Sequence, residues 1–272
     1  MSVLTLTTTT ENVTIAIRVK DRDKMIDFYQ GLIGFALKQE ENTLAIMGVK
    51  EKEAQHLWLE ESPRAEEYFG EMKKLQQATL TVSSVEELSD LYQRLKEASY
   101  PIVQTSYDEK ARIVVDDPEK NRLEVVATIG EKEVKNDEQL LALATGKFAA
   151  LSKYASFQGV HLNVTESQKE EKFLQNILGF YLGKKEATSE ASAQENFGVT
   201  LHTSNSQAID MGSDDVLGLE IIRFIVTDEV LTALEQHLAE EEQAFYIDKK
   251  KTLLTVYDPV GIEWWFVRKS DK

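Results

Sequence analysis

The sequence predicts an α+β protein built from four βαβββ units that form two pairs. The first reason is a repeat: Val13 to Phe35, VTIAIRVKDRDKMIDFYQGLIGF, recurs in outline from Val160 to Phe180 as VHLNVTESQKEEKFLQNILGF, with two Phe and one Gly at a constant offset. The second reason is a strand, an amphipathic helix and three short strands that recur in this order. We therefore expect two domains, residues 1–130 and 158–272, joined by a partly helical linker at residues 131–157.

The first unit shows the pattern most clearly. Val13 to Val19 is rich in β-branched residues and predicts a strand, and Asp21 is a suitable N-cap for the helix that follows. Gly34 indicates a left-handed end of that helix. The apolar stripe of the helix consists of Met25, Phe28, Tyr29 and Leu32, and the three later strands are expected at residues 36–38, 43–47 and 57–59.

The second unit repeats this order more faintly. Its first strand is expected at Ala78 to Val82, and Asp117 and Pro118 predict the turn before its last strand. In the linker, residues 138–151 predict a helix. The helical stripe of the unit consists of Val85, Leu88, Leu91 and Leu95, and the later strands are expected at residues 101–103, 111–115 and 123–126.

The third and fourth units complete the second pair. The third spans Val160 to Met211, and its run Phe197 to His202 is predicted to match the strand at residues 43–47, with an insertion at residues 184–194. The fourth spans Glu220 to Val267. Its helical stripe is formed by Val230, Leu231, Leu234 and Leu238, and its turn by Asp258 and Pro259.

Composition narrows the class of function. The 272 residues carry 47 acidic and 31 basic side chains, a net charge of −16, so nucleic acid is not an expected partner. The absence of cysteine excludes disulfides, thiolate chemistry and cysteine-bound zinc. No stretch approaches the about 18 apolar residues of a membrane helix, and the start MSVLTLTTTTEN does not resemble a secretion signal. We therefore expect an acidic cytoplasmic protein without a membrane partner.

Two stretches carry a family resemblance. DRDKMIDFYQGLIGF and DDPEKNRLEVV resemble the helix-entry and last-strand signatures of the vicinal oxygen chelate superfamily, which includes glyoxalase I, bleomycin-resistance proteins and extradiol dioxygenases. The resemblance implies that paired βαβββ units form two glyoxalase-like half-barrels, each able to hold a divalent metal on its concave face. The two-domain layout and the stretch WLEESPRAEEYFG are similar to the streptococcal CppA family, whose members are labelled C3-degrading proteinases.

The resemblance also implies where metal ligands would stand. In the first domain these positions are Thr14, Gln77 and Glu124, of which only Glu124 fits the usual carboxylate pattern. A hydroxyl is a poor ligand, and one carboxylate with one amide binds transition metals weakly. If the three side chains converge, they could bind a small ligand or simply satisfy one another by hydrogen bonds. No metal is therefore expected, and a divalent transition metal on Gln77 and Glu124 is the alternative.

The second domain is further from the family pattern. Its corresponding positions are Gly159, Ile221 and Trp265, none of which ligates a metal. His161 should share the face of Gly159 because strand side chains alternate, and it either points into the cavity or is an ordinary half-buried histidine. Trp264 and Trp265 must face opposite sides of their strand, so one of them is expected to line the second cavity.

Three functions remain open on the sequence. The first is a binding or interaction protein that lost the metal, with a small molecule or a protein as its partner and a homodimer as a possible assembly. The second is a dioxygenase-like or lyase enzyme using Gln77 and Glu124, with a further ligand from His56 or Glu60. The third is the proteinase of the CppA label, although no GxSxG or HExxH motif occurs. We favour the first and nominate no catalytic residue.

Overall fold

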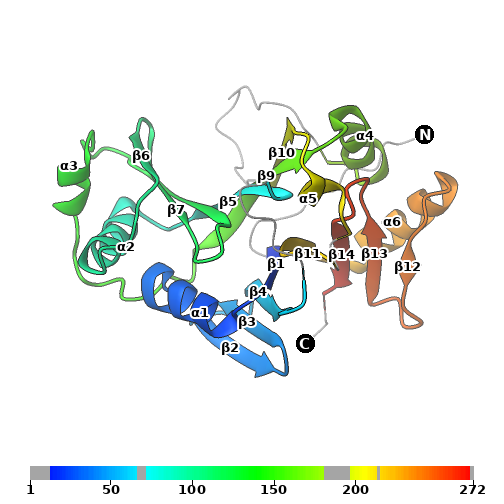
Figure 1. Ribbon diagram of the computed structural model, residues 1–272, viewed down its shortest axis with the longest axis horizontal. Helices are drawn as coiled ribbons and strands as arrows, with labels where there is room; N and C mark the ends of the chain where they lie inside the picture. Colours follow the sequence, from blue (N-terminus) through cyan, green and yellow to red (C-terminus); the bar gives the residue numbers. More distant parts are fainter. Residues whose placement is uncertain (1–12, 66–71, 181–196, 213–214, 270–272) are drawn as a thin grey trace.

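The structure, a computed structural model, describes residues 13–65, 72–180, 197–212 and 215–269. The element orders predicted for the first two units are confirmed (Figure 1). Unit 1 contains β1 (Val13–Val19), α1 (Arg22–Ile26), the π-helix η2 (Asp27–Ile33), β2 (Ala36–Glu41), β3 (Leu44–Gly48) and β4 (Gln55–Glu61). Unit 2 contains β5 (Leu75–Thr81), α2 (Val85–Glu97), β6 (Gln104–Tyr107), β7 (Lys110–Asp116) and β8 (Arg122–Thr128).

The second pair of units follows a short helix, α3 (Asp137–Leu141). The order predicted for unit 4 is also confirmed. Unit 3 contains β9 (Ser156–Val164), α4 (Ser167–Lys172), the π-helix η3 (Phe173–Ile177), β10 (Gly198–Thr203) and α5 (Gln207–Asp210). Unit 4 contains β11 (Gly218–Val226), α6 (Asp228–Glu240), β12 (Tyr246–Ile247), β13 (Leu253–Tyr257) and β14 (Glu263–Arg268).

The strands of the described residues form two sheets. One has eight strands in the order β12-β13-β14-β11-β1-β4-β3-β2, and the other has six in the order β10-β9-β5-β8-β7-β6. The eight-stranded sheet therefore joins unit 1 to unit 4, and the six-stranded sheet joins unit 2 to unit 3. Figure 1 shows the blue β1 beside β11, which comes from the far half of the chain. Pairing of units adjacent in sequence, which the repeat predicted, is wrong for these sheets.

Two antiparallel junctions produce this exchange. β1 pairs with β11, with Thr14 opposite Arg223, and β5 pairs with β9, with Gln77 opposite His161. β1 and β11 are rich in apolar residues, and six of the seven residues of β1 are buried. An apolar pattern of this kind predicts a central strand but does not identify its neighbour.

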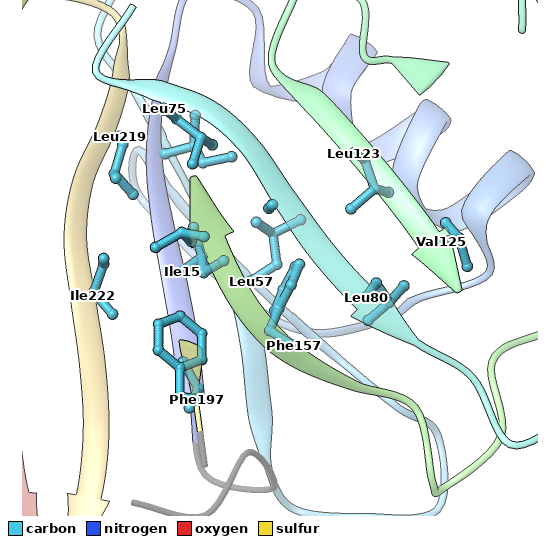
Figure 2. Close-up of a cluster of buried hydrophobic side chains, with 14 of the residues drawn as sticks. Ile15, Leu57, Leu75, Leu80, Leu123, Val125, Phe157, Phe197, Leu219 and Ile222 are labelled. Atoms are coloured by element: carbon cyan, nitrogen blue, oxygen red, sulfur yellow. The ribbon is translucent and has the colours of Figure 1, made fainter. Parts of the chain in front are cut away.

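A shared core lies between the two sheets. Figure 2 shows side chains from β1 and β11 meeting side chains from β5, β8 and β9 in one cluster. Ile15 and Ile222 come from the eight-stranded sheet, whereas Leu80 and Phe157 come from the six-stranded sheet, and none of the four is more than 1% exposed. Burial of such side chains stabilises the fold by roughly 1.5–3 kcal/mol each.

The helix ends follow the predicted chemistry. The Asp21 side chain accepts a hydrogen bond from the backbone N–H of Lys24, which makes it the N-cap of α1, and Gly34 ends η2 with a φ of 102°. A side chain at Gly34 would meet the backbone of Leu151 at 3.0 Å and would strain the left-handed conformation. The sequence therefore fixes both ends of this segment.

The linker helix is shorter than the predicted span of residues 138–151. It ends at Leu141, residues 142–144 continue it as a turn, and residues 145–148 then bond to α2. The Asp90 carboxylate accepts hydrogen bonds from the backbone N–H groups of Thr145, Gly146 and Phe148. These charge-assisted bonds compete with helix formation, and the Ala/Leu composition of the linker gave no sign of them.

Unit 3 also differs from the prediction. β10 pairs in parallel with β9, just as β4 pairs with β1 and β8 with β5, so β10 is the last strand of its unit. Its match to the third strand of unit 1 was wrong, because a short apolar run does not reveal its place in a sheet. The predicted insertion at residues 184–194 lies outside the described residues. Among the helices that the structure describes, none combines the length and the apolar character needed to cross a membrane.

Candidate functional site

The exchange of units separates the predicted site residues. Thr14 and Trp265 lie in the eight-stranded sheet, whereas Gln77, Glu124 and His161 lie in the six-stranded sheet. The predicted convergence of Thr14 with Gln77 and Glu124 is therefore wrong. Its physical reason is the strand pairing: β1 has β11 and β4 as neighbours, not a strand of unit 2.

The six-stranded sheet carries a cavity of about 250 Å³ that several polar side chains line, and we call it the six-stranded trough. β5, β8 and β9 place Thr79, Glu124 and Gly159 side by side across its floor, and His161 lies next to Thr200 along the β9–β10 pair. The residues that line it are Thr79, Lys110, Arg112, Glu124, Val126, Gln158, Gly159, Val160, His161, Gly198 and Thr200.

Glu124 is the acidic centre of this trough. Its Oε2 accepts a hydrogen bond from Thr79 Oγ1 at 3.1 Å, and its Oε1 lies 3.9 Å from Arg112 Nε. Arg112 is itself held by Asp108, whose two carboxyl oxygens lie 2.8 and 2.7 Å from its Nη1. The hydroxyl that satisfies Glu124 is thus that of Thr79 and not that of Thr14.

Sequence reasoning passed over Thr79. It stands two residues after Gln77 on β5, so strand alternation puts both on one face, and only the register with β8 shows which of them meets Glu124. Gln77 lies beside His161 in the β5–β9 pair. The alternation of side chains along β5 could have indicated Thr79 from the sequence, but the register of β5 with β8 could not be read from it.

Glycines shape the floor of the trough. A Cβ at Gly159 would lie 2.5 Å from the carbonyl oxygen of Gly198, so β10 approaches closer than any side chain at this position allows. The family position for a metal ligand therefore stands where the fold itself requires glycine.

The eight-stranded sheet gathers a different set, which we call the Arg223 cluster: Thr14, Trp58, Arg223 and Trp265. Arg223 lies between Thr14 on β1 and Trp265 on β14. The indoles of Trp58 and Trp265 meet edge to face, with ring centroids 5.8 Å apart. Trp264 points the other way into the core, fully buried, where its Nε1 donates to Asp258 at 3.0 Å. This opposite facing of the two tryptophans agrees with the alternation predicted from sequence.

His56 and Glu60, suggested as further ligands for Gln77 and Glu124, lie on β4 of the eight-stranded sheet. They are therefore not neighbours of those two residues in either sheet. Burial lowers the pKa of His56 to about 4, which makes it a neutral imidazole at neutral pH, and its Nδ1 lies 3.3 Å from the carbonyl oxygen of Ala54. This is the environment of a packed histidine.

The donor set does not fit a tightly held transition metal. Among the described residues, no three His, Asp or Glu side chains gather in a geometry that could hold a metal ion. The six-stranded trough offers one carboxylate and one imidazole, and Glu124 is already engaged by Thr79. Transition metals in proteins usually have three or four protein ligands, and the trough offers two, so we derive no metal-dependent step.

Comparisons with known proteins agree with this architecture. Residues 13–125 match the model of the Glyoxalase/Bleomycin resistance protein/Dioxygenase superfamily, and residues 151–266 match that of the CppA C-terminal domain. The first half of the chain is thus similar to the glyoxalase superfamily. Its second half is similar to the CppA C-terminal domain. No curated protein matches the sequence.

Solved structures share the fold of this chain over almost its whole length. The cppA protein from Streptococcus pneumoniae TIGR4 aligns with a TM-score of 0.61 and 15% identity, covering 95% of this chain and 98% of that one. A putative dioxygenase from Bacillus subtilis gives 0.65 and 15%, covering 98% and 87%. Glyoxalase I from Zea mays gives 0.56 and 14%, covering 94% and 92%. At these identities the likeness concerns the fold alone.

Proposed function

We propose that the chain is a binding protein that holds a small polar molecule in the six-stranded trough without a transition metal. The observation that carries this proposal is the cavity of about 250 Å³ whose floor combines Glu124, His161 and Arg112 with two glycines. A concave site with a few convergent polar groups is the usual form of a small-molecule site. The cytoplasm is the compartment that we propose for it, in agreement with a chain that has no cysteine.

The lining favours a ligand that both donates and accepts hydrogen bonds. Glu124 accepts, Arg112 and Lys110 donate, and the hydroxyls of Thr79 and Thr200 can do either. Such a set is complementary to a hydroxylated or amide-bearing molecule rather than to a hydrocarbon. The closeness of Arg112 Nε to Glu124 also means that a bound metal cation would meet a positive charge.

The first test is native mass spectrometry of the purified chain, with Glu124→Gln as the variant. We expect a co-purified small molecule in the wild type and its loss in the variant, because an amide replaces two carboxylate acceptors by one. Glu41→Gln is the matched control, because Glu41 is exposed on β2, away from the trough. Retention of the molecule by Glu124→Gln would contradict the placement of the site.

Metal analysis of protein purified without chelator is the second test. We expect no stoichiometric transition metal. A stoichiometric ion that is lost in Glu124→Ala would overturn the proposal in favour of the metal-dependent enzyme. Cleavage of complement C3 by the purified protein, persisting with inhibitors of contaminating proteases, would overturn it in favour of the proteinase.

A further inference from the structure

A half-buried guanidinium, with no acidic partner among the described residues, lies at the centre of the Arg223 cluster. Arg223 Nη1 donates to Thr14 Oγ1 at 3.3 Å, and this hydroxyl already donates to the carbonyl oxygen of Gln55 at 2.8 Å. Within the described ranges, Arg223 forms no ion pair with a carboxylate. Burial lowers the pKa of Arg223, and no neighbouring charge raises it again. The positive charge is therefore partly removed from water without compensation.

Other arginines of the chain show how unusual this is. Arg18 pairs with Glu220, and Arg122 pairs with Asp116 at 2.9 Å. Arg94 donates to the carbonyl oxygens of Leu32 and Ile33, both at 3.1 Å. These buried or half-buried guanidinium groups use their edges to bind oxygen. Among the described residues, the N–H edge of Arg223 has a single long hydrogen bond, to a hydroxyl, although a guanidinium carries five N–H donors.

Two indoles complete the cluster. The Arg223 guanidinium lies 5.4 Å from the centroid of the Trp58 ring, and this cation–π contact stabilises its positive charge. The contact does not provide hydrogen-bond acceptors for the N–H groups at the edge of the guanidinium. Trp265 Nε1 is buried and has no hydrogen-bond partner in the part of the chain that the structure describes. By contrast, Trp58 Nε1 donates to Gln55 Oε1 at 2.9 Å. Among the described residues, the buried N–H of Trp265 thus lacks an acceptor, and Arg223 has a single long bond to Thr14.

Two glutamates on the neighbouring strands do not accept a hydrogen bond from Arg223. Glu263 stands beside Ile221 in the β11–β14 pair, and Glu60 stands beside Arg18 in the β1–β4 pair. Each is therefore out of register with Arg223, which has Thr14 and Trp265 as its direct neighbours. Trp58, Arg223 and Trp265 all remain partly exposed, so an incoming molecule can reach the guanidinium and the exposed parts of the two indoles, although Trp265 Nε1 itself is buried.

We propose that the Arg223 cluster is a second binding site, distinct from the six-stranded trough, that takes a small organic carboxylate with a flat apolar body. The carboxylate accepts from the Arg223 edge and from Trp265 Nε1, and the apolar body packs against the two indoles. A guanidinium offers two parallel N–H groups that match a carboxylate. The aromatic walls favour a ligand with a ring over a bare inorganic anion.

The test follows the indole N–H resonance of Trp265 in protein carrying isotope-labelled tryptophan. Benzoate is the probe, and benzamide, of the same shape without charge, is its control. We expect a saturable shift of the resonance with millimolar benzoate and none with benzamide. In Arg223→Met, which keeps the length of the side chain, we expect affinity to fall at least about tenfold, with an intermediate loss in Arg223→Lys because the bidentate geometry is lost.

Arg112→Met is the matched control, because it removes a guanidinium from the six-stranded trough and should leave benzoate binding unchanged. Circular dichroism checks the fold of each variant, and Arg223→Lys serves if Arg223→Met does not fold. No shift with benzoate, an equal affinity in the Arg223 variants, or saturation by inorganic phosphate but not by benzoate would overturn the proposal. Because Glu124→Gln is not expected to change this titration, failure here leaves the proposed function of the other trough standing.

Discussion

At the scale of single residues, one buried acid carries a pH dependence. Glu170 in α4 is fully buried against Asp258, and neither of its carboxyl oxygens accepts a hydrogen bond from the described residues. The Asp258 carboxylate already accepts from the backbone N–H of Val260 and Ile262 and from Trp264 Nε1. Burial and the charge of the nearby Asp258 raise the pKa of Glu170 well above its ordinary value, which favours the protonated acid at neutral pH.

Glu170→Gln should flatten the alkaline loss of stability. A carboxyl group whose pKa is raised by folding stabilises the fold below its ordinary pKa of 4.5 and loses this contribution as pH rises towards about 9. The Gln amide stays uncharged at every pH. Urea unfolding between neutral and alkaline pH should show the wild type losing about 1–3 kcal/mol more than the variant.

The control for this titration is Glu166→Gln, at the exposed start of α4 beside Lys169. It should run parallel to the wild type. If the stability of Glu170→Gln shows the same pH dependence as the wild type, Glu170 is not protonated in the folded protein at neutral pH.

At the scale of elements, β9 and the edge strand β10 of the six-stranded sheet lie in close contact. Gly159 and Gly198 are register partners in this parallel pair. The backbones meet here without side chains, and the adjacent Glu124 and Thr79 remain accessible from the trough. A side chain on β9 would have to displace a backbone carbonyl, which is harder than moving a flexible side chain.

Gly159→Ala should therefore destabilise the fold by about 1–3 kcal/mol, the usual range for overpacking. Urea unfolding measures this difference. Gly31→Ala is the matched control: no heavy atom lies within 4 Å of its added Cβ, and in a helical segment alanine gains up to about 1 kcal/mol over glycine. An unchanged unfolding midpoint for Gly159→Ala would mean that β10 does not approach β9 as closely as described.

At the scale of the whole molecule, the two halves of the sequence depend on each other. β1 of the first half pairs with β11 of the second, and β5 pairs with β9, so two of the central strand junctions cross between halves. Units adjacent in sequence still touch through other contacts, since Tyr29 of η2 donates to Asp117 at 2.9 Å. Each half alone would expose the apolar edges of two central strands.

Residues 13–130 and 151–269, expressed separately, should lack cooperative unfolding and should regain it when mixed in equal amounts. Near-ultraviolet circular dichroism and size-exclusion chromatography follow this reassembly. The intact chain is the reference. A half that unfolds alone with the stability of the intact chain would show that it can pair its own units.

The sequence by itself determined the α+β class, the repeated units and the ends of their helices, because these depend on residues close together in the chain. Asp21 and Gly34 bound the first helical segment through local hydrogen bonds and backbone conformation. Glu124 and His161 could also be nominated, because family position and strand alternation are both local signals.

Only the tertiary structure decided which units share a sheet, and therefore which side chains meet. β1 has the apolar composition of a central strand, and this composition allows β5 or β11 as its neighbour equally well. Because β1 pairs with β11, Thr14 accepts a hydrogen bond from Arg223, and Glu124 accepts its hydrogen bond from the hydroxyl of Thr79. Strand partnership is set by how all the apolar faces are buried at once, a property of the folded chain that no short stretch contains.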